Sequence, residues 1–210
     1  MTWTSGVGRA CGVLLDAIVH LLALARINPN GLTLMGLVVN TYAAFLFGYA
    51  NGDNQRRMFF YAGLVIIGSG FFDLVDGRVA RASNQVTRFG GFFDSIVDRY
   101  SDASLFLGLL VFYGRGNRFF YVVLAALAMI SAIMVSYARA RAESLIGSCK
   151  VGFMERPERL VLLIIGALFN AMAPVLWVIA VLSTITVIHR VIYTWQRTRE
   201  MDAPLAGRAA

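Results

Sequence analysis

The sequence predicts an all-α integral membrane protein, a bundle of six transmembrane helices preceded by an N-terminal interfacial amphipathic helix. Of its 210 residues, 58% are hydrophobic and only 15% are charged, and the mean hydropathy is +0.67. Soluble domains of this size rarely have so apolar a composition. Six spans of about 20 residues each, with short loops, would use nearly the whole chain. We therefore expect a single membrane domain over residues 1–210 and no nucleic-acid partner.

The N-terminal segment predicts an amphipathic helix at about residues 8–26 that lies along the membrane surface. Apolar residues recur there at helical spacing, whereas Asp16, His20 and Arg26 fall elsewhere on the helical wheel. A buried first span is the alternative. No basic residue precedes Arg9, and Asp16 and His20 interrupt the apolar stretch, so we expect no cleaved signal peptide.

Six longer apolar runs predict the spans. Asn28-Pro29-Asn30-Gly31 breaks the first helix and offers a cap for the next one. The expected spans cover residues of about 31–50, 58–76, 92–113, 119–138, 158–171 and 173–193.

The basic residues predict the orientation of these spans. One side of the predicted bundle has only four arginines, Arg56, Arg57, Arg115 and Arg118, and the other side has all of the remaining basic residues. The positive-inside rule therefore places both termini in the cytoplasm and the protein in the cytoplasmic membrane. Cys11 and Cys149 lack the spacing of metal ligands and receive no role.

Four carboxylates stand out at the predicted cytoplasmic ends of the second and third spans. They are Asp73, Asp76, Asp94 and Asp98, among the twelve acidic residues of the chain. Acidic side chains in such apolar surroundings suggest a functional site. The first two are spaced i,i+3 and the last two i,i+4, so each pair faces one way from its helix.

These four carboxylates predict a divalent metal site. Two antiparallel helices would bring the pairs together, and four converging carboxylates need a compensating cation. Ligands that are all oxygen favour Mg²⁺ or Mn²⁺ over zinc, and two ions could bind a pyrophosphate. Gly77, Gly90 and Gly91 leave room for a nucleotide, and Arg78 and Arg81 add positive charge. The alternative is that the acids are helix-end charges paired with neighbouring arginines.

The spacing of these residues resembles a known family signature. The string from Asp73 to Asp98 matches every fixed position of D-x2-D-G-x2-A-R-x8-G-x3-D-x3-D, the signature of the CDP-alcohol phosphotransferases. The resemblance implies an enzyme that transfers a phosphoalcohol group from a CDP-activated lipid to a hydroxyl and releases CMP. It also implies the six-span outline and a homodimer.

The resemblance implies a role for each motif residue. Asp73, Asp76 and Asp94 would bind metal, and Asp98 would complete the second metal site and act as the general base. The CDP moiety would contact Asp73, Gly77, Ala80, Arg81 and Thr87. A carboxylate beside metal is suited to take the proton of the attacking hydroxyl.

A second group of charged residues concerns the acceptor. Arginines near the ends of the last three spans predict an acceptor that carries phosphate. Here the chain is similar to the phosphatidylinositol phosphate synthases, which use CDP-diacylglycerol and inositol 1-phosphate. The similarity to that branch implies that Arg139, Arg156 and Arg190 bind the acceptor phosphate. Arg159 is a further candidate for the same role. That branch would be expected to have lysine at position 139. Arg139 keeps the positive charge but departs from that pattern, so its contact geometry with the phosphate would differ.

Several alternatives stay open at the level of the sequence. Arg139 and Arg141 could be ordinary cytoplasmic flanks, Glu155 and Glu158 could pair with Arg156 and Arg159, and Arg190 could neutralise a motif aspartate. Glycerol 3-phosphate would need a similar cationic pocket, and an archaeal lipid donor would leave the signature unchanged. A cation- or proton-coupled transporter is a more remote alternative, because the acids cluster at one face and no inverted repeat is visible.

Overall fold

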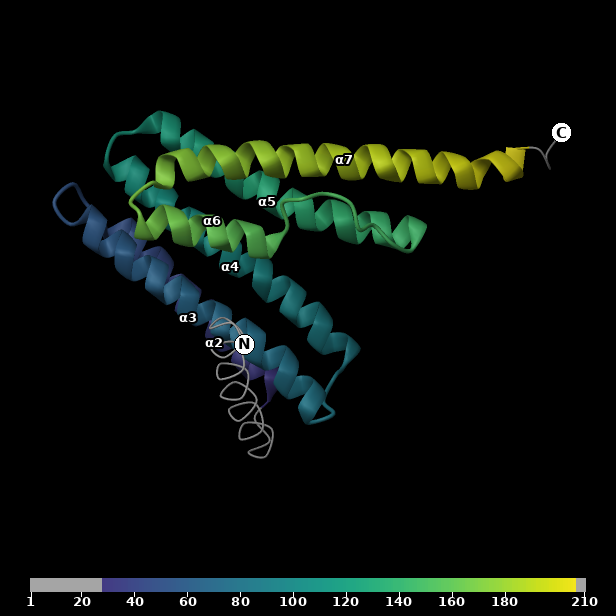
Figure 1. Ribbon diagram of the computed structural model, residues 1–210, viewed down its shortest axis with the longest axis horizontal. Coiled ribbons are helices and arrows are strands. Elements are labelled where there is room, and N and C mark those ends of the chain that lie inside the picture. The colour runs from purple at the N-terminus through teal and green to yellow at the C-terminus, as the bar shows by residue number, and fades with distance from the viewer. Residues whose placement is uncertain (1–27, 207–210) are drawn as a thin grey trace, which may run out of the picture. The chain divides into compact units, whose positions relative to one another are not determined.

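The computed structural model describes residues 28–206, and these form six α-helices joined by short loops (Figure 1). The helices are α2 (Pro29–Tyr49), α3 (Gln55–Ala82), α4 (Arg88–Arg115), α5 (Phe119–Ile146), α6 (Arg156–Leu168) and α7 (Met172–Ala206). The all-α prediction is thus confirmed over the described residues. The predicted interfacial helix at residues 8–26 lies outside them.

Four of the described helices, α2, α3, α5 and α7, are long and apolar enough to cross a membrane. Large apolar side chains such as Phe45 and Leu127 are more than half exposed on their surfaces, as expected of side chains that contact lipid. The 13 residues of α6 reach about 20 Å at 1.5 Å per residue, less than the ~30 Å hydrocarbon core. Charged residues occupy the first half of α4. Six spans therefore remain a prediction.

Some helices extend beyond the apolar runs that predicted them. Helix α3 continues past residue 76 to Ala82, and α5 continues past residue 138 to Ile146. Aspartate, arginine and alanine are compatible with helix even where the apolar pattern has ended. As a result, the motif residues from Asp73 to Arg81 all lie on one helix.

The chain divides into two compact units, and helices α2, α3 and α4 each contribute to both. The first unit contains the chain up to Tyr42 together with Val65–Ser101. Val75 and Val79 are buried in it, with Leu32 of α2 packed against them. Helix α2 approaches α3 closely at Gly36, whose carbonyl accepts a 3.2 Å hydrogen bond from the Ser69 hydroxyl.

The second unit contains Ala43–Leu64 and the chain from Asp102 onward. Phe59 contacts Phe47 and Phe112 edge to face, each at 4.9 Å between ring centroids. Helices α5 and α6 both pack along α7 (Figure 1). The loop between α5 and α6 is fixed on α7, because the Met154 N–H donates a 3.1 Å hydrogen bond to the Thr186 hydroxyl.

Candidate active site

The four predicted aspartates lie in the first unit, on two helices joined by a short loop. Asp73 and Asp76 belong to α3, and Asp94 and Asp98 belong to α4. Thr87 caps the beginning of α4, since its hydroxyl oxygen accepts a 2.9 Å hydrogen bond from the Gly90 N–H. This cap fixes the start of the helix that carries the second aspartate pair.

Most of the predicted nucleotide-site residues line one cavity of about 260 Å³. Its walls include Asp76, Gly77, Ala80 and Arg81 of α3, Thr87 from the loop, and Gly90, Gly91 and Asp94 of α4. The cavity also contains residues that were not predicted, namely Pro29, Asn30, Thr33, Gln85 and Val86. The motif therefore builds a concave site of small-molecule type, with one wall supplied by the start of α2.

Asp76 is the most constrained carboxylate of this cavity. Its side chain is buried and accepts hydrogen bonds from the Thr33 hydroxyl at 2.7 Å and from the Gly77 N–H at 2.5 Å. Asp73 and Asp94 both interact with it electrostatically. Two carboxylates thus repel the buried Asp76, an arrangement that a cation would stabilise.

Asp73 and Asp98 are not among the residues that line the cavity. An Asp73 carboxylate oxygen lies 3.1 Å from the position that a Cβ would take at Gly36, so α2 packs directly on this side chain. An Arg99 guanidinium nitrogen lies 4.0 Å from an Asp98 carboxylate oxygen.

The four predicted aspartates have the ligand chemistry that a hard divalent cation requires. All four predicted ligands supply oxygen atoms only, which suits Mg²⁺ or Mn²⁺. Within residues 28–206, however, no three acidic, histidine or cysteine side chains converge closely enough to hold one ion. Binding of one ion by three of these aspartates would therefore require their side chains to turn toward one another.

The glycines of the motif serve different purposes. At Gly77, a Cβ would lie 3.6 Å from an Arg81 guanidinium nitrogen, so Arg81 folds over the glycine. At Gly90, a Cβ would come within 3.0 Å of the Thr87 hydroxyl that caps α4. At Gly91, which lines the cavity, a Cβ would meet nothing within 4 Å, so the glycine leaves this part of the wall open.

The predicted acceptor arginines lie in the second unit and occur as two pairs, each joined by a carboxylate. Glu155 joins the first pair: one of its oxygens accepts hydrogen bonds from Arg139 of α5 at 2.9 Å and from Arg190 of α7 at 2.8 Å. Arg190 also donates to the carbonyl oxygens of Val151 and Val135. The Arg190 side chain is only 1% exposed, and its hydrogen bonds to Val151 and Glu155 connect α7 to the α5–α6 loop.

Asp102 joins the second pair, and sequence reasoning missed it. Arg159 of α6 is 2% exposed and donates to an Asp102 oxygen at 2.5 Å. The other Asp102 oxygen lies 3.5 Å from Arg156. The spacing of Asp102, four residues after Asp98 on the same face of α4, was an available signal. Glu155 and Glu158 form a capping box at the start of α6.

Comparison with known proteins gives the same family as the motif. The family model for CDP-alcohol phosphatidyltransferases matches residues 26–199. The chain is 37% identical to the archaetidylinositol phosphate synthase of Pyrococcus horikoshii, over 89% of this chain and 93% of that protein. It is 33% identical to the phosphatidylinositol phosphate synthase of Streptomyces avermitilis, over 88% of this chain and 79% of that protein.

Solved structures agree with the sequence matches. The crystal structure of Mycobacterium tuberculosis phosphatidylinositol phosphate synthase (PgsA1) with CDP-DAG bound has a TM-score of 0.77 and 29% identity, covering 86% of this chain and 93% of that one. The same protein in complex with manganese and citrate has a TM-score of 0.74 at 29% identity, over 86% and 88%. With a family model over most of its length and relatives above 30% identity, this chain belongs to the CDP-alcohol phosphatidyltransferase family and is a transferase.

Proposed function

We propose that this chain transfers a phosphatidyl-type group from a CDP-activated lipid, CDP-diacylglycerol, to inositol 1-phosphate and releases CMP. The observation that carries the proposal is the cavity of the first unit, in which motif residues of α3 and α4 meet. The similarity to inositol phosphate lipid synthases over most of the chain supports the choice of acceptor.

The aspartates would bind the metal and carry out the proton transfer. Asp73, Asp76, Asp94 and Asp98 would hold Mg²⁺ or Mn²⁺, with two ions as the expected number. Bound metal would polarise the pyrophosphate and make CMP a better leaving group. Asp98 would take the proton from the attacking hydroxyl of the acceptor. A manganese complex of the related Mycobacterium tuberculosis enzyme supports divalent metal use.

The nucleotide would occupy the cavity beside these aspartates. Gly77 and Ala80 present little side chain, so CDP could approach the α3 backbone. Arg81 and Thr87 would contact the phosphates and the cytidine, and Asp73 would contribute from α3. The complex of the Mycobacterium tuberculosis enzyme with CDP-DAG supports a lipid-linked nucleotide as donor.

The acceptor phosphate would be bound by the arginines of the second unit. Arg139 and Arg156 are 38% and 19% exposed and are suited to direct contact. Arg159 and Arg190, at 2% and 1%, would support them or make contact after moving away from Asp102 and Glu155. A doubly charged phosphate can accept several charge-assisted hydrogen bonds at once, which a neutral alcohol cannot.

The same proposal includes the membrane setting. Residues 1–210 would form one domain of six transmembrane helices with an interfacial helix at residues 8–26. The enzyme would be a homodimer in the cytoplasmic membrane, with both termini and the active site facing the cytoplasm, where soluble acceptors are available. The arginine excess on one side of the predicted bundle supports this orientation.

Release of CMP from defined substrates tests the proposal. Purified protein with CDP-diacylglycerol and Mg²⁺ would be offered inositol 1-phosphate, glycerol 3-phosphate, inositol or serine in separate reactions. We expect inositol 1-phosphate to give the fastest release and excess chelator to abolish it. Faster turnover with inositol or serine would contradict the phosphate pocket, and preference for glycerol 3-phosphate would change only the product. A CDP-activated archaeal lipid in a parallel reaction would identify the donor class.

A further inference from the structure

A second cavity, of about 250 Å³, lies in the second unit where the α2–α3 loop meets the α4–α5 loop. Its lining is cationic and polar. Arg115 ends α4 and Arg118 lies in the loop after it, whereas Asn51 lies in the other loop and Gln55 begins α3. Phe112 supplies an aromatic wall. No acidic residue lines it. The proposed transferase chemistry makes no use of this cavity.

The arginines at this cavity differ from those of the acceptor cluster in lacking carboxylate partners. Arg139, Arg156, Arg159 and Arg190 are each within salt-bridge distance of an acid. Across residues 28–206, by contrast, no ion pair involves Arg115 or Arg118, nor Arg56 and Arg57 at the start of α3. Arg115 donates a 2.6 Å hydrogen bond to the Gly48 carbonyl oxygen, which fixes the guanidinium but does not neutralise its charge. The cavity therefore has uncompensated positive charge.

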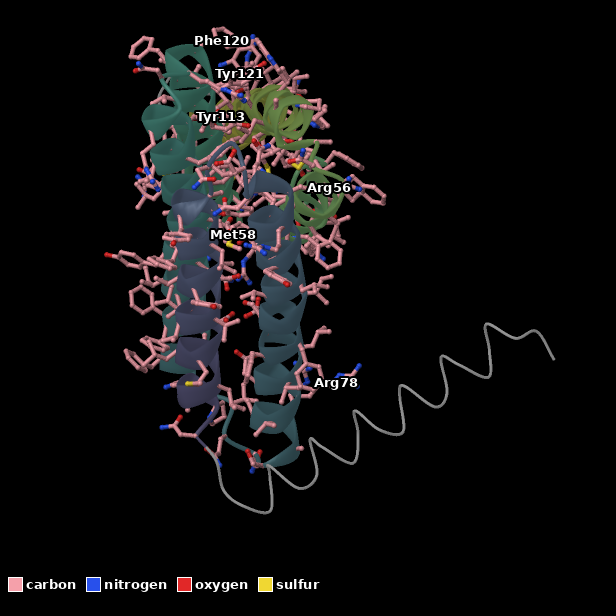
Figure 2. The ribbon with its side chains drawn as sticks, turned by 90° about the vertical axis from the view of Figure 1, so that its left-hand side faces the viewer. Arg56, Met58, Arg78, Tyr113, Phe120 and Tyr121 are labelled. Atoms are coloured by element: carbon pink, nitrogen blue, oxygen red, sulfur yellow. The ribbon has the colours of Figure 1, made fainter. Side chains whose placement is uncertain are left out.

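Aromatic side chains around these loops indicate their depth in the membrane. Phe120 and Trp177 are 58% and 48% exposed and contact each other at 5.8 Å between ring centroids. The buried Tyr113 stacks on Tyr121 at 5.1 Å. Figure 2 shows Tyr113, Phe120 and Tyr121 gathered at one end of α4 and α5. Tyrosine and tryptophan are enriched where a membrane protein crosses the headgroup layer. At that depth, the phosphates of lipid headgroups are the most concentrated anions available.

We propose that this cavity binds the phosphate of a membrane phospholipid headgroup, with Arg115 and Arg118 as its charged contacts. Gln55 and Asn51 would donate hydrogen bonds to the same headgroup. The acyl chains would lie along the exposed apolar surface of the neighbouring helices. Arginine suits the site because its guanidinium can donate two parallel hydrogen bonds to a phosphate. The site is independent of the proposed function, since none of its residues belongs to the CDP or acceptor machinery.

Native mass spectrometry of the full-length protein in detergent tests the proposal, with phosphatidylglycerol as the probe. We expect the wild type to retain one more phosphatidylglycerol than Arg118→Gln, whose affinity should fall about tenfold because a charge-assisted hydrogen bond is lost. Arg57→Gln is the matched control: it removes the same charge two residues after Gln55, in the first turn of α3, but Arg57 does not line the cavity. Its affinity should change by less than about twofold.

Two further experiments test whether the bound phosphate belongs to a lipid and whether the cavity itself is the binding site. Millimolar inorganic phosphate should leave the lipid bound, because it lacks the acyl chains. Gly52→Phe places a bulky side chain on the lining of the cavity while both arginines remain, so lipid retention should fall. An added Cβ at Gly52 would meet nothing within 4 Å, so the fold should accept the substitution. Equal lipid retention by the wild type, Arg118→Gln and Gly52→Phe would overturn the proposal. Equal losses in Arg118→Gln and Arg57→Gln, or displacement by inorganic phosphate, would overturn it as well.

Discussion

At the scale of single residues, the hydroxyl of Thr33 is the clearest feature that the motif does not include. It donates to Asp76, a proposed metal ligand, from a helix 43 positions earlier in the sequence. Thr33 is itself buried. Hydrogen bonds to a ligating carboxylate fix its orientation and its readiness to bind metal. Thr33 is therefore a positioning residue for the proposed site.

Replacement of Thr33 should weaken metal binding more than it weakens folding. Thr33→Val keeps the shape and loses the hydroxyl, so we expect the Mn²⁺ dissociation constant to rise about tenfold. Thr33→Ser keeps the hydroxyl and should bind nearly as the wild type does. Electron paramagnetic resonance of free Mn²⁺ during a titration measures both constants. Identical Mn²⁺ affinity in the valine variant would show that this hydrogen bond does not prepare Asp76.

A second prediction at the residue scale concerns the acids that pair with the buried arginines, Asp102 and Glu155. Asp102→Ala would leave the buried Arg159 guanidinium without its carboxylate, a change that typically costs about 3–5 kcal/mol. Glu155→Ala should cost less, because the Glu155 carboxylate is 39% exposed and solvent can replace it in part. Thermal unfolding in detergent compares the two variants. A larger loss of stability in Glu155→Ala would contradict this ranking.

At the scale of elements, close helix contacts depend on glycine. Helices α2 and α4 meet in the second unit at Gly108, where a Cβ would come within 2.2 Å of the Ala44 carbonyl oxygen. No side chain fits at that distance unless the backbone of one helix moves. The missing side chain at Gly108 therefore lets the backbones of α2 and α4 approach each other, although both helices contain large aromatic residues.

Gly108→Ala should therefore destabilise the protein, although alanine is the better helix former. Overpacking costs roughly 1–3 kcal/mol, more than the helix propensity that alanine gains. Gly68→Ala is the matched control, because it lies in α3 with nothing within 4 Å of the added Cβ. We expect a lower unfolding temperature for the first variant only. Equal unfolding temperatures for both variants would mean that α2 and α4 do not pack this closely.

At the scale of the whole molecule, the sequence predicted the helices better than their limits and contacts. The apolar runs located all six described helices, since burial and lipid contact require such runs. They did not locate the end of α3, because its last turns combine charged residues with good helix formers. The motif residues Asp76, Arg81, Thr87 and Asp94 do line one cavity. The pairing of Asp102 with Arg159, 57 positions apart, depends on packing that no local pattern encodes.

The most direct test of the central claim is a single time course that follows both products. Wild-type protein and Asp98→Asn would receive CDP-diacylglycerol, inositol 1-phosphate and Mg²⁺, and CMP and the lipid product would be measured together. We predict equal amounts of CMP and phosphatidylinositol phosphate from the wild type. Asp98→Asn should still bind the CDP-lipid but form neither product, because it lacks the base. CMP without the lipid product, or full activity in Asp98→Asn, would contradict the proposed transfer.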